Sequence, residues 1–233
     1  MSHRLFADPQ YPAVPVAGTD NLYPVHRIFC VGRNYAEHAK EMGVEVDREE
    51  PFYFLKDAQS LVLTGATKAY PPGTTNYHYE MELAVAIGAP AFNVSVEDAP
   101  KAVFGYGCSL DMTRRDLQLN ARAKSRPWDL GKNFEESAVV APLTPAAAFG
   151  EVGPQDIWLD VNGTRRQAAH LRDLVWSVPE LISHLSRFYH LQPGDLILTG
   201  TPAGVGAVVA GDVITGGITG LADVAFTVGQ AEA

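Results

Sequence analysis

The sequence has little cysteine, no long apolar run and no cluster of basic residues. It contains two cysteines, Cys30 and Cys108, among 233 residues, too few for a disulfide framework in a chain of this length. No run of about 18 consecutive apolar residues occurs, and the N-terminal residues lack the apolar core of a signal peptide. We therefore expect a cytoplasmic protein with reduced, buried thiols and no membrane segment.

Positive charge is also scarce. Eighteen Lys and Arg residues stand against 27 Asp and Glu residues, which leaves a formal net charge of −9. Nucleic-acid binding depends on clustered cations that neutralise phosphates, so this balance argues against a nucleic-acid partner. With 46% hydrophobic and 19% charged residues, the composition is that of a globular protein with a sizeable core, which excludes disorder for the bulk of the chain.

Local patterns predict a β-rich α+β domain behind an extended arm. Residues 1–24 hold four prolines and little periodicity, which is typical of an extended segment that packs on the rest of the chain. Residues 25–233 contain no internal repeat and no low-complexity linker, so we expect one domain there. Alternating aromatic and β-branched residues predict strands within residues 26–31, 49–65 and 78–88.

Helices are predicted where good helix formers meet start and stop signals. Thr113 and Asp116 have the spacing of a capping box, which predicts a helix over residues 112–123. An Asn-Gly pair between two strand-like runs predicts a hairpin over residues 157–167. The other expected helices cover residues 34–43 and 178–190.

Three carboxylates are candidate metal ligands. Glu80 and Glu82 lie two apart in a strand-like run, so both leave the same face, where neighbouring like charges repel unless a cation sits between them. A solvated strand edge is the structural alternative. Asp111 follows an apolar strand where a helix is predicted to begin, a place where an N-cap is also common. Three carboxylates with no competing Cys or His pattern suit Mg²⁺ or Mn²⁺, and Ca²⁺ stays open.

Further candidates for chemistry lie around the first predicted helix and in a later turn. His38 and Glu41 are three apart on that helix, so the carboxylate can orient the imidazole, although a surface pair is the ordinary explanation. Arg33 comes just before the helix and can bind an anion there, with solvent exposure as the default. Lys132 follows a glycine in a turn, where a lysine is ordinarily exposed.

Two polar groups on the predicted helix over residues 112–123 are placed to reach the same pocket as Asp111. Gln118 lies two helical turns after Asp111, and Arg115 lies one turn after it, where it can simply pair with that carboxylate. The segment LTGTPAGVG around Thr201 has the glycines of a phosphate loop but lacks the Gly-Lys-Ser/Thr ending. We interpret it as a turn that offers backbone N–H groups and hydroxyls to a carboxylate.

Seven segments between residues 26 and 228 occur together in an order that is typical of one family. They are CVGRNYAEHAKEM, FLK, HYEMELAVAIG, GYGCSLDMTRRDLQ, GKNFEESAVVAP, LDVNGTRRQ and LTGTPAGVG. On these segments the sequence resembles the fumarylacetoacetate hydrolase family, and specifically its acylpyruvate and fumarylpyruvate hydrolase branch. One departure is Tyr79, where the family often has a histidine. It leaves Glu80 and Glu82 in place, so it bears on substrate shape more than on the metal.

The resemblance implies a fold and a set of site residues. The implied fold is a mixed β-sandwich roll of the family's C-terminal-domain type, which makes residues 25–233 a catalytic domain that is commonly a homodimer. The implied ligands of a divalent metal, Mg²⁺ with Mn²⁺ or Ca²⁺ as alternatives, are Glu80, Glu82 and Asp111. The implied catalytic residues are His38, Glu41 and Lys132. The implied substrate contacts are Arg33, Tyr106, Arg115, Gln118 and Thr201.

The function that the resemblance implies is hydrolysis of the C–C bond of an acylpyruvate, a small keto acid. Fumarylpyruvate, cleaved to fumarate and pyruvate in aromatic catabolism via gentisate, is the expected substrate. Two alternatives stay open: an oxaloacetate decarboxylase, tautomerase or related β-keto acid isomerase on the same site, and a metal-dependent binder without turnover. His38 and Glu41 favour the hydrolase because they supply a base for water.

Overall fold

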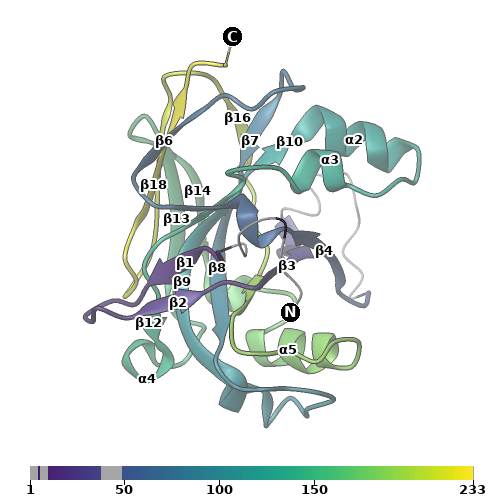
Figure 1. Cartoon of the computed structure of the whole chain (residues 1–233), viewed down its shortest axis with the longest axis vertical. Helices are drawn as coiled ribbons and strands as arrows, with labels where there is room; N and C mark the ends of the chain where they lie inside the picture. The colour runs from purple at the N-terminus through teal and green to yellow at the C-terminus, as the bar shows by residue number, and fades with distance from the viewer. Residues whose placement is uncertain (1–4, 6–9, 38–48, 233) are drawn as a thin grey trace.

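A mixed sheet of eight strands is the largest layer of the protein. The computed structural model describes residue 5, residues 10–37 and residues 49–232. Within this part of the chain the sheet has the order β4-β3-β15-β8-β9-β11-β5, and β12 pairs with β9 (Figure 1). Its strands are β3 (Arg27–Gly32), β4 (Phe52–Lys56), β5 (Leu61–Leu63), β8 (Met81–Ile87), β9 (Val103–Asp111), β11 (Ala138–Val140), β12 (Thr144–Pro145) and β15 (Asp195–Leu198).

Three smaller sheets surround it. A five-stranded sheet has the order β14-β13-β17-β18-β6, a three-stranded one has the order β10-β7-β16, and β1 pairs with β2. The strands of the five-stranded sheet are β6 (Ala66–Ala69), β13 (Asp156–Val161), β14 (Thr164–His170), β17 (Val213–Ile218) and β18 (Val224–Gly229). The others are β1 (Ala13–Pro15), β2 (Leu22–Pro24), β7 (Tyr77–Tyr79), β10 (Thr113–Arg114) and β16 (Gly206–Val208).

The large sheet is buried on both faces. Side chains alternate between the two faces of a strand, and on β8 Leu83 belongs to a core shared with Ile157 of the five-stranded sheet. On the other face, Ala84 packs in a second core with Val14 and Tyr23 of the β1–β2 hairpin. This double burial explains why β8 is a continuous apolar run after its glutamate, rather than an alternating one.

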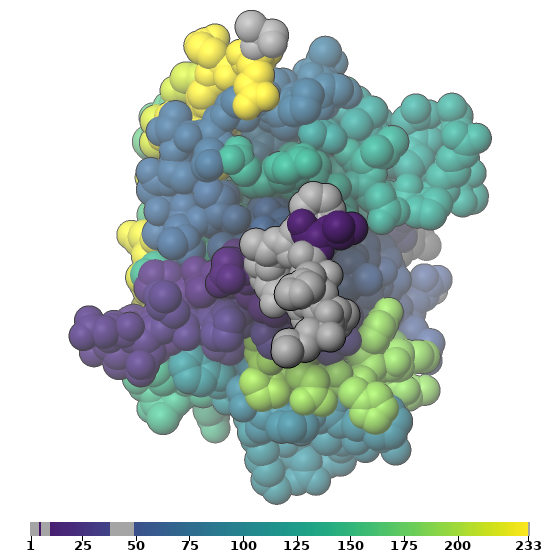
Figure 2. Space-filling model, in the orientation of Figure 1, coloured from purple at the N-terminus to yellow at the C-terminus, as the bar shows by residue number. Residues whose placement is uncertain are grey.

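Short helices cover two ends of the large sheet. In Figure 1, α2 and α3 lie together beyond β4, and α5 lies on the opposite side of that strand; Figure 2 shows α2 in teal at the upper right and α5 in yellow-green below. None of the described helices is long and apolar enough to span a membrane. The helices are α2 (Arg115–Ala123), α3 (Asp129–Lys132), α4 (Ala146–Phe149), α5 (Val178–Ser186) and the 3-10 turns η1 (Ala58–Ser60), η2 (Ala99–Ala102) and η3 (Leu171–Asp173).

Several sequence predictions are confirmed here. The chain is β-rich with short helices, as expected for the α+β class. The predicted hairpin is β13–β14, whose turn residues Asn162 and Gly163 have φ angles of 51° and 75°, as a type I′ turn requires. The helix predicted over residues 178–190 is α5, which begins where predicted but ends at Ser186. Both cysteines are buried and free.

The helix predicted over residues 112–123 begins three residues later, at Arg115. Thr113 does not act as a cap, because it belongs to β10 and its hydroxyl bonds to the Asp111 carbonyl oxygen. The Asp116 carboxylate accepts hydrogen bonds from Thr74 and Thr75 instead of closing a capping box. The capping-box interpretation is therefore wrong, since tertiary partners take both side chains.

The predicted N-terminal arm contains a strand pair within its described residues. The hairpin β1–β2 packs on the large sheet, and the hydroxyl oxygen of Tyr23 lies within hydrogen-bond distance of the carbonyl oxygens of Ile87 and Asp195, at 2.7 and 2.9 Å. The division of the chain at residue 24 stays a prediction. Most of the helix predicted over residues 34–43 lies outside the described residues.

A glycine after β15 sets the approach of two loops, and its replacement tests that geometry. Gly200 has a φ of +96°, and an added Cβ would lie 2.8 Å from the Cβ of Asn34. We expect Gly200→Ala to lower the free energy of unfolding by about 3 kcal/mol, measured by urea denaturation. The matched control is Gly211→Ala, which has a φ of +98° but open space around the added Cβ, so about 1 kcal/mol is expected. Equal losses in the two variants would contradict the close approach.

Candidate active site

Three acidic side chains meet in the large sheet at the point where β9 ends and its neighbour β8 begins. Glu82 lies on β8, Glu80 comes directly before that strand, and Asp111 is the last residue of the antiparallel neighbour β9. One carboxylate oxygen from each residue lies within 4.8 Å of the other two, and all three side chains are buried. The structure therefore brings together the three carboxylates that the sequence singled out; they are called the acidic triad below.

Lys132 joins two members of the acidic triad. Its Nζ lies 2.7 Å from Glu80 Oε2, 2.6 Å from Asp111 Oδ2 and 2.7 Å from Thr113 Oγ1, so its three N–H groups each have an acceptor. The side chain is only 2% exposed, because α3 directs it inward instead of forming a surface turn. The ordinary explanation of this residue as a surface lysine is therefore wrong.

Lys56 is a second buried lysine, which the sequence analysis missed. Its Nζ donates to the carbonyl oxygens of Met112 and Lys132 and to Ser137 Oγ, and it lies 2.9 Å from Asp111 Oδ1. One signal in the sequence could have indicated its burial. Side chains alternate along the strand FYFLK, so Lys56 lies on the same face as Phe52 and Phe54.

The residues present fit a hard divalent cation. Lys56 spends its three N–H groups on other acceptors, so Asp111 Oδ1, although buried and close to that ammonium, accepts no hydrogen bond from any described residue. Burial, together with the charges of Asp111 and Glu80, raises the pKa of Glu82 well above its usual range. Asp111 Oδ1 therefore has a free lone pair, and Glu82 has no salt bridge with any described residue. A divalent metal bound by oxygen ligands would compensate both groups.

The two lysines differ in how their surroundings affect their charge. Burial opposes the charged form of Lys132, but the carboxylates of Asp111 and Glu80 outweigh it and raise the pKa of Lys132. Burial dominates at Lys56, whose pKa is lowered. Of the two lysines, Lys132 therefore holds its proton, and with it its positive charge, more strongly beside the acidic triad.

The first two turns of α2 bring an arginine and a glutamine to the site. The guanidinium of Arg115 pairs with Glu80 and donates to Gln118 Oε1 at 2.5 Å. The pairing of Arg115 with Asp111 that its spacing allowed is wrong, because the Arg115 guanidinium pairs with Glu80 instead. Both Arg115 and Gln118 are buried at the edge of a cleft.

The glycine-rich turn after β15 also reaches the acidic triad. The backbone N–H of Gly200 donates to Glu82 Oε2 at 2.7 Å, so one of its donors is used by a carboxylate of the protein itself. The hydroxyl of Thr201 accepts a hydrogen bond of 2.8 Å from Gln167 Nε2 and lines the same cleft.

A cleft lies beside the acidic triad, and Glu80 and Glu82 are among the residues that line it. It is walled by aromatic rings and cationic side chains. Its lining residues include Arg33, Phe52, Phe54, Glu80, Glu82, Arg115, Gln118, Arg122, Trp128, Lys132 and Thr201.

The structure does not bring every sequence candidate to this cleft. Tyr106 lies an odd number of positions before Asp111 on β9, so its side chain is on the opposite face, where its ring packs 5.1 Å from that of Phe149. The substrate contact implied for Tyr106 is therefore not found at this cleft. His38 and Glu41 lie outside the described residues.

The buried Lys56 makes a stability prediction. Lys56→Met leaves the Asp111 carboxylate with less compensating charge and three polar groups without their donor, so we expect unfolding to become about 3 kcal/mol easier in chelator-treated protein. The control is Lys68→Met, which removes a half-exposed pair with Glu136 and is expected to cost less than about 1 kcal/mol. Urea titrations of both variants measure the difference, and similar costs would contradict a structural role for Lys56.

Comparison with known proteins gives a consistent family. Residues 27–229 match the family described as fumarylacetoacetate (FAA) hydrolase C-terminal. A fumarylpyruvate hydrolase of a Ralstonia species is 56% identical over 194 residues, which cover 82% of this chain and 100% of that protein. A mitochondrial oxaloacetate tautomerase of Arabidopsis thaliana is 43% identical over 202 residues, covering 87% of this chain and 90% of that protein.

A solved structure supports the same grouping. The fumarylpyruvate hydrolase of Pseudomonas aeruginosa, crystallised with Mn²⁺ and pyruvate, superposes with a TM-score of 0.94 at 46% identity. The match covers 98% of this chain and 100% of that chain. The roll expected from the resemblance is thereby confirmed.

Proposed function

This chain belongs to the fumarylacetoacetate hydrolase family, and from that premise we propose how its cleft works. The protein is a hydrolase that cleaves the C–C bond of acylpyruvates, with fumarylpyruvate as substrate and a divalent metal as cofactor. The observation that carries this function is the buried acidic triad, two of whose members, Glu80 and Glu82, line a cleft together with cationic side chains. Carboxylates without nitrogen or sulfur ligands select a hard divalent cation.

The residues around the acidic triad bind and orient the pyruvoyl half of the substrate. Arg115 and Gln118 stand at the cleft edge and present N–H donors to a carboxylate. When bound, a divalent ion supplies positive charge beside the oxygen on which an enolate develops. Lys132 adds a fixed ammonium there, and because its N–H groups hold Glu80, Asp111 and Thr113, it acts through its charge and by positioning the carboxylates.

The base for water is assigned to His38, with Glu41 orienting its imidazole. His38 takes a proton from a water molecule whose oxygen bonds to the distal carbonyl carbon. The bond between that carbon and the pyruvoyl methylene then breaks, and its electron pair passes to pyruvate enolate, which a proton converts to pyruvate. The products are one carboxylic acid and pyruvate, so one water is consumed for each C–C bond broken.

A direct assay tests this function. The purified protein is incubated with Mg²⁺ and fumarylpyruvate, loss of the enol absorbance is followed, and the products are identified by mass. We expect fumarate and pyruvate, with turnover abolished by EDTA. Conversion of oxaloacetate without hydrolysis of fumarylpyruvate would instead support the tautomerase or decarboxylase alternative, which the 43% identical relative represents.

Three finer points belong to the same proposal. Mg²⁺ is proposed as the native metal because it shares oxygen ligands with Mn²⁺, the ion named for the Pseudomonas aeruginosa structure. A homodimer and a role in cytoplasmic aromatic catabolism follow from the family resemblance, and the free, buried Cys30 and Cys108 are compatible with a reducing compartment. Metal analysis of the purified protein identifies the native metal, light scattering gives the oligomeric state, and cell fractionation gives the compartment.

A further inference from the structure

Gln167 is a buried amide that joins β14 to two other segments near the acidic triad. The side chains on either side of it along β14 are exposed, whereas its own is fully buried. Its Oε1 accepts a hydrogen bond of 3.0 Å from the backbone N–H of Met81. Its Nε2 donates to Thr201 Oγ1 at 2.8 Å and to the carbonyl oxygen of Pro202 at 2.7 Å. Both N–H groups and the carbonyl oxygen of this amide therefore have partners.

A β-bulge in β14 places this amide against the glycine-rich turn after β15. The register of the β13–β14 hairpin shifts between Leu159 and Asp160, which leaves Arg166 as the extra residue on β14. The backbone of the turn approaches this bulge closely, because a Cβ on Gly204 would clash with the carbonyl oxygen of Arg166. The backbone of the hairpin therefore sets where Gln167 meets the turn.

The partners of Gln167 decide which way its amide faces. The Met81 N–H can only donate and the Pro202 carbonyl oxygen can only accept, so Oε1 faces the first and Nε2 the second. Because Nε2 carries only donors, Thr201 Oγ1 is the acceptor in its bond with Gln167, and the hydroxyl hydrogen is directed elsewhere. No residue that the structure describes accepts that hydrogen, and Thr201 lines the cleft. The hydroxyl of Thr201 therefore presents a donor to the cleft.

The turn that carries Thr201 is also held at two further points. The backbone N–H of Gly200 donates to Glu82, and the hydroxyl oxygen of Tyr79 lies 3.1 Å from the carbonyl oxygen of Gly204. The backbone of the turn thus has supports that do not involve the Gln167 amide, whereas the direction of the Thr201 hydroxyl depends on that amide.

We propose that Gln167 is a positioning residue for the pyruvoyl half of the substrate. It keeps the Thr201 hydroxyl as a donor toward an acceptor oxygen of that half, although Gln167 does not itself line the cleft. Its other end holds Met81, which lies between the two glutamates of the acidic triad, so one amide sets this donor in place relative to the triad. The inference rests on the proposed function and adds to it a residue that acts through Thr201.

The test measures binding of pyruvate to the Mg²⁺-loaded protein by calorimetry. Gln167→Glu keeps the shape of the side chain and an acceptor for Met81. A carboxyl group carries at most one hydrogen, which the Pro202 carbonyl oxygen takes, so the Thr201 hydroxyl turns to donate to the new side chain. We expect pyruvate to bind about tenfold more weakly, the effect of one lost hydrogen bond to a charged ligand. Thr201→Val removes the same donor and is expected to weaken binding by a similar factor.

The double variant separates positioning from a purely structural role. If Gln167 acts through the Thr201 hydroxyl, the two losses are not independent, and the double variant binds pyruvate about tenfold more weakly, as each single variant does. A residue that only supports the fold weakens binding whether or not Thr201 has a hydroxyl, so losses that multiply to roughly a hundredfold would overturn the proposal. Unchanged binding of pyruvate by either single variant would also overturn it.

The matched control is Gln155→Glu. The side chain of Gln155 likewise accepts a backbone N–H, from Gly153, and donates to a backbone carbonyl oxygen, of Glu151, but it is not one of the described residues that line the cleft. Its replacement is expected to leave pyruvate binding unchanged. A loss equal to that of Gln167→Glu would contradict a role specific to Gln167.

A second pair of variants decides if Gln167→Glu does not fold. Thr201→Ser keeps the hydroxyl and is expected to bind pyruvate as the original protein does, whereas Thr201→Val is not; equal binding by the two would overturn the proposal. Hydrolysis of fumarylpyruvate is followed separately. Coupled losses of pyruvate binding without hydrolysis would reject the proposed function and leave the positioning role, whereas hydrolysis with independent losses would reject only the positioning role.

Discussion

Replacing Glu82 by glutamine is expected to remove bound metal and activity together. Glu82 is 2% exposed, its neighbours Glu80 and Asp111 are also carboxylates, and the backbone N–H of Gly200 donates a hydrogen bond to it. The amide oxygen of the new side chain can accept the same hydrogen bond, so the fold is expected to persist, whereas the negative charge that attracts a divalent cation is lost. A metal contributes several kcal/mol to such a reaction, so turnover is expected to fall by roughly a thousandfold or more.

Metal content and turnover of Glu82→Gln are measured on the same purified sample. Elemental analysis after dialysis gives the metal, and loss of the enol absorbance of fumarylpyruvate gives the rate. The control Glu97→Gln makes the same chemical change at an exposed glutamate and is expected to keep both. A Glu82→Gln protein that retains a full equivalent of tightly bound metal would contradict the assignment of the acidic triad.

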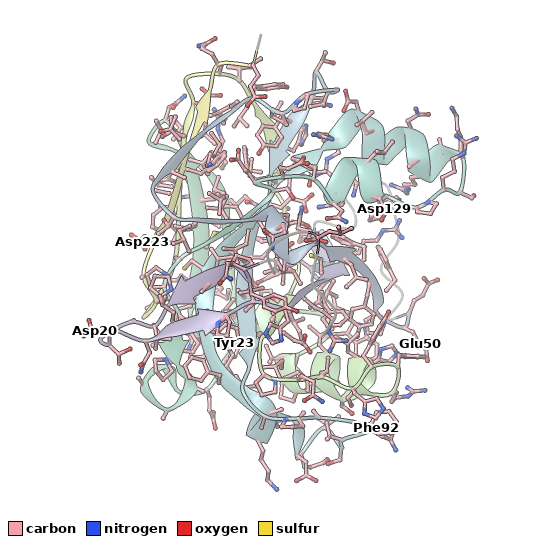
Figure 3. All side chains as sticks on the ribbon, in the orientation of Figure 1. Asp20, Tyr23, Glu50, Phe92, Asp129 and Asp223 are labelled. Atoms are coloured by element: carbon pink, nitrogen blue, oxygen red, sulfur yellow. The ribbon has the colours of Figure 1, made fainter. Side chains whose placement is uncertain are left out.

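Replacing His38 by alanine is expected to leave metal binding intact and to slow hydrolysis by at least about a hundredfold, the contribution of one positioned general base. Metal binding is expected to persist because His38 is proposed to deprotonate the water molecule and is not a member of the acidic triad. The control is His190→Ala, at an exposed histidine stacked on Phe92, which Figure 3 labels near the lower edge of the view. Near-normal turnover by His38→Ala with full metal content would reject the His38–Glu41 dyad.

The carboxylates were the part of the site that the sequence predicted best. Glu80 and Glu82 share one short segment, and strand geometry alone puts side chains two residues apart on one face. Asp111 was placed at the end of a strand by its apolar run, and the structure has it as the last residue of β9. The local sequence pattern did not predict that β8 pairs with β9. This pairing brings Asp111 next to Glu80.

The lysines were harder to predict because exposure is a tertiary property. From local pattern alone, Lys132 is an ordinary turn lysine, and only the family resemblance selected it; α3 then directs it to Glu80 and Asp111. Lys56, at the end of β4, is not among the residues predicted from local pattern, yet it is buried, donates hydrogen bonds to three groups and lies 2.9 Å from the Asp111 carboxylate. A charged residue becomes buried only when distant partners compensate it, and those partners are invisible to a local pattern.

The same reason explains the wrong helix start. Thr113 and Asp116 have the spacing of a capping box, but Thr113 bonds with Lys132 and Asp116 bonds with Thr74. Each tertiary partner competes for a side chain that the local rule assumes to be available. At Ser177 and Glu180 no such competitor intervenes, and the capping box of α5 forms.

The sequence by itself determined the β-rich class, the β13–β14 hairpin, α5 and the pair of glutamates on one face, because each depends on residues that are close along the chain and on the periodicity of strands and helices. Only the tertiary structure decided that Lys132 and Lys56 are buried, that Arg115 pairs with Glu80 and that Tyr106 faces away from the cleft. It also decided that Arg33 and Arg122 line the same cleft. These facts depend on contacts between residues from separate strands and helices, where charge compensation and burial act through space and leave no period in the sequence.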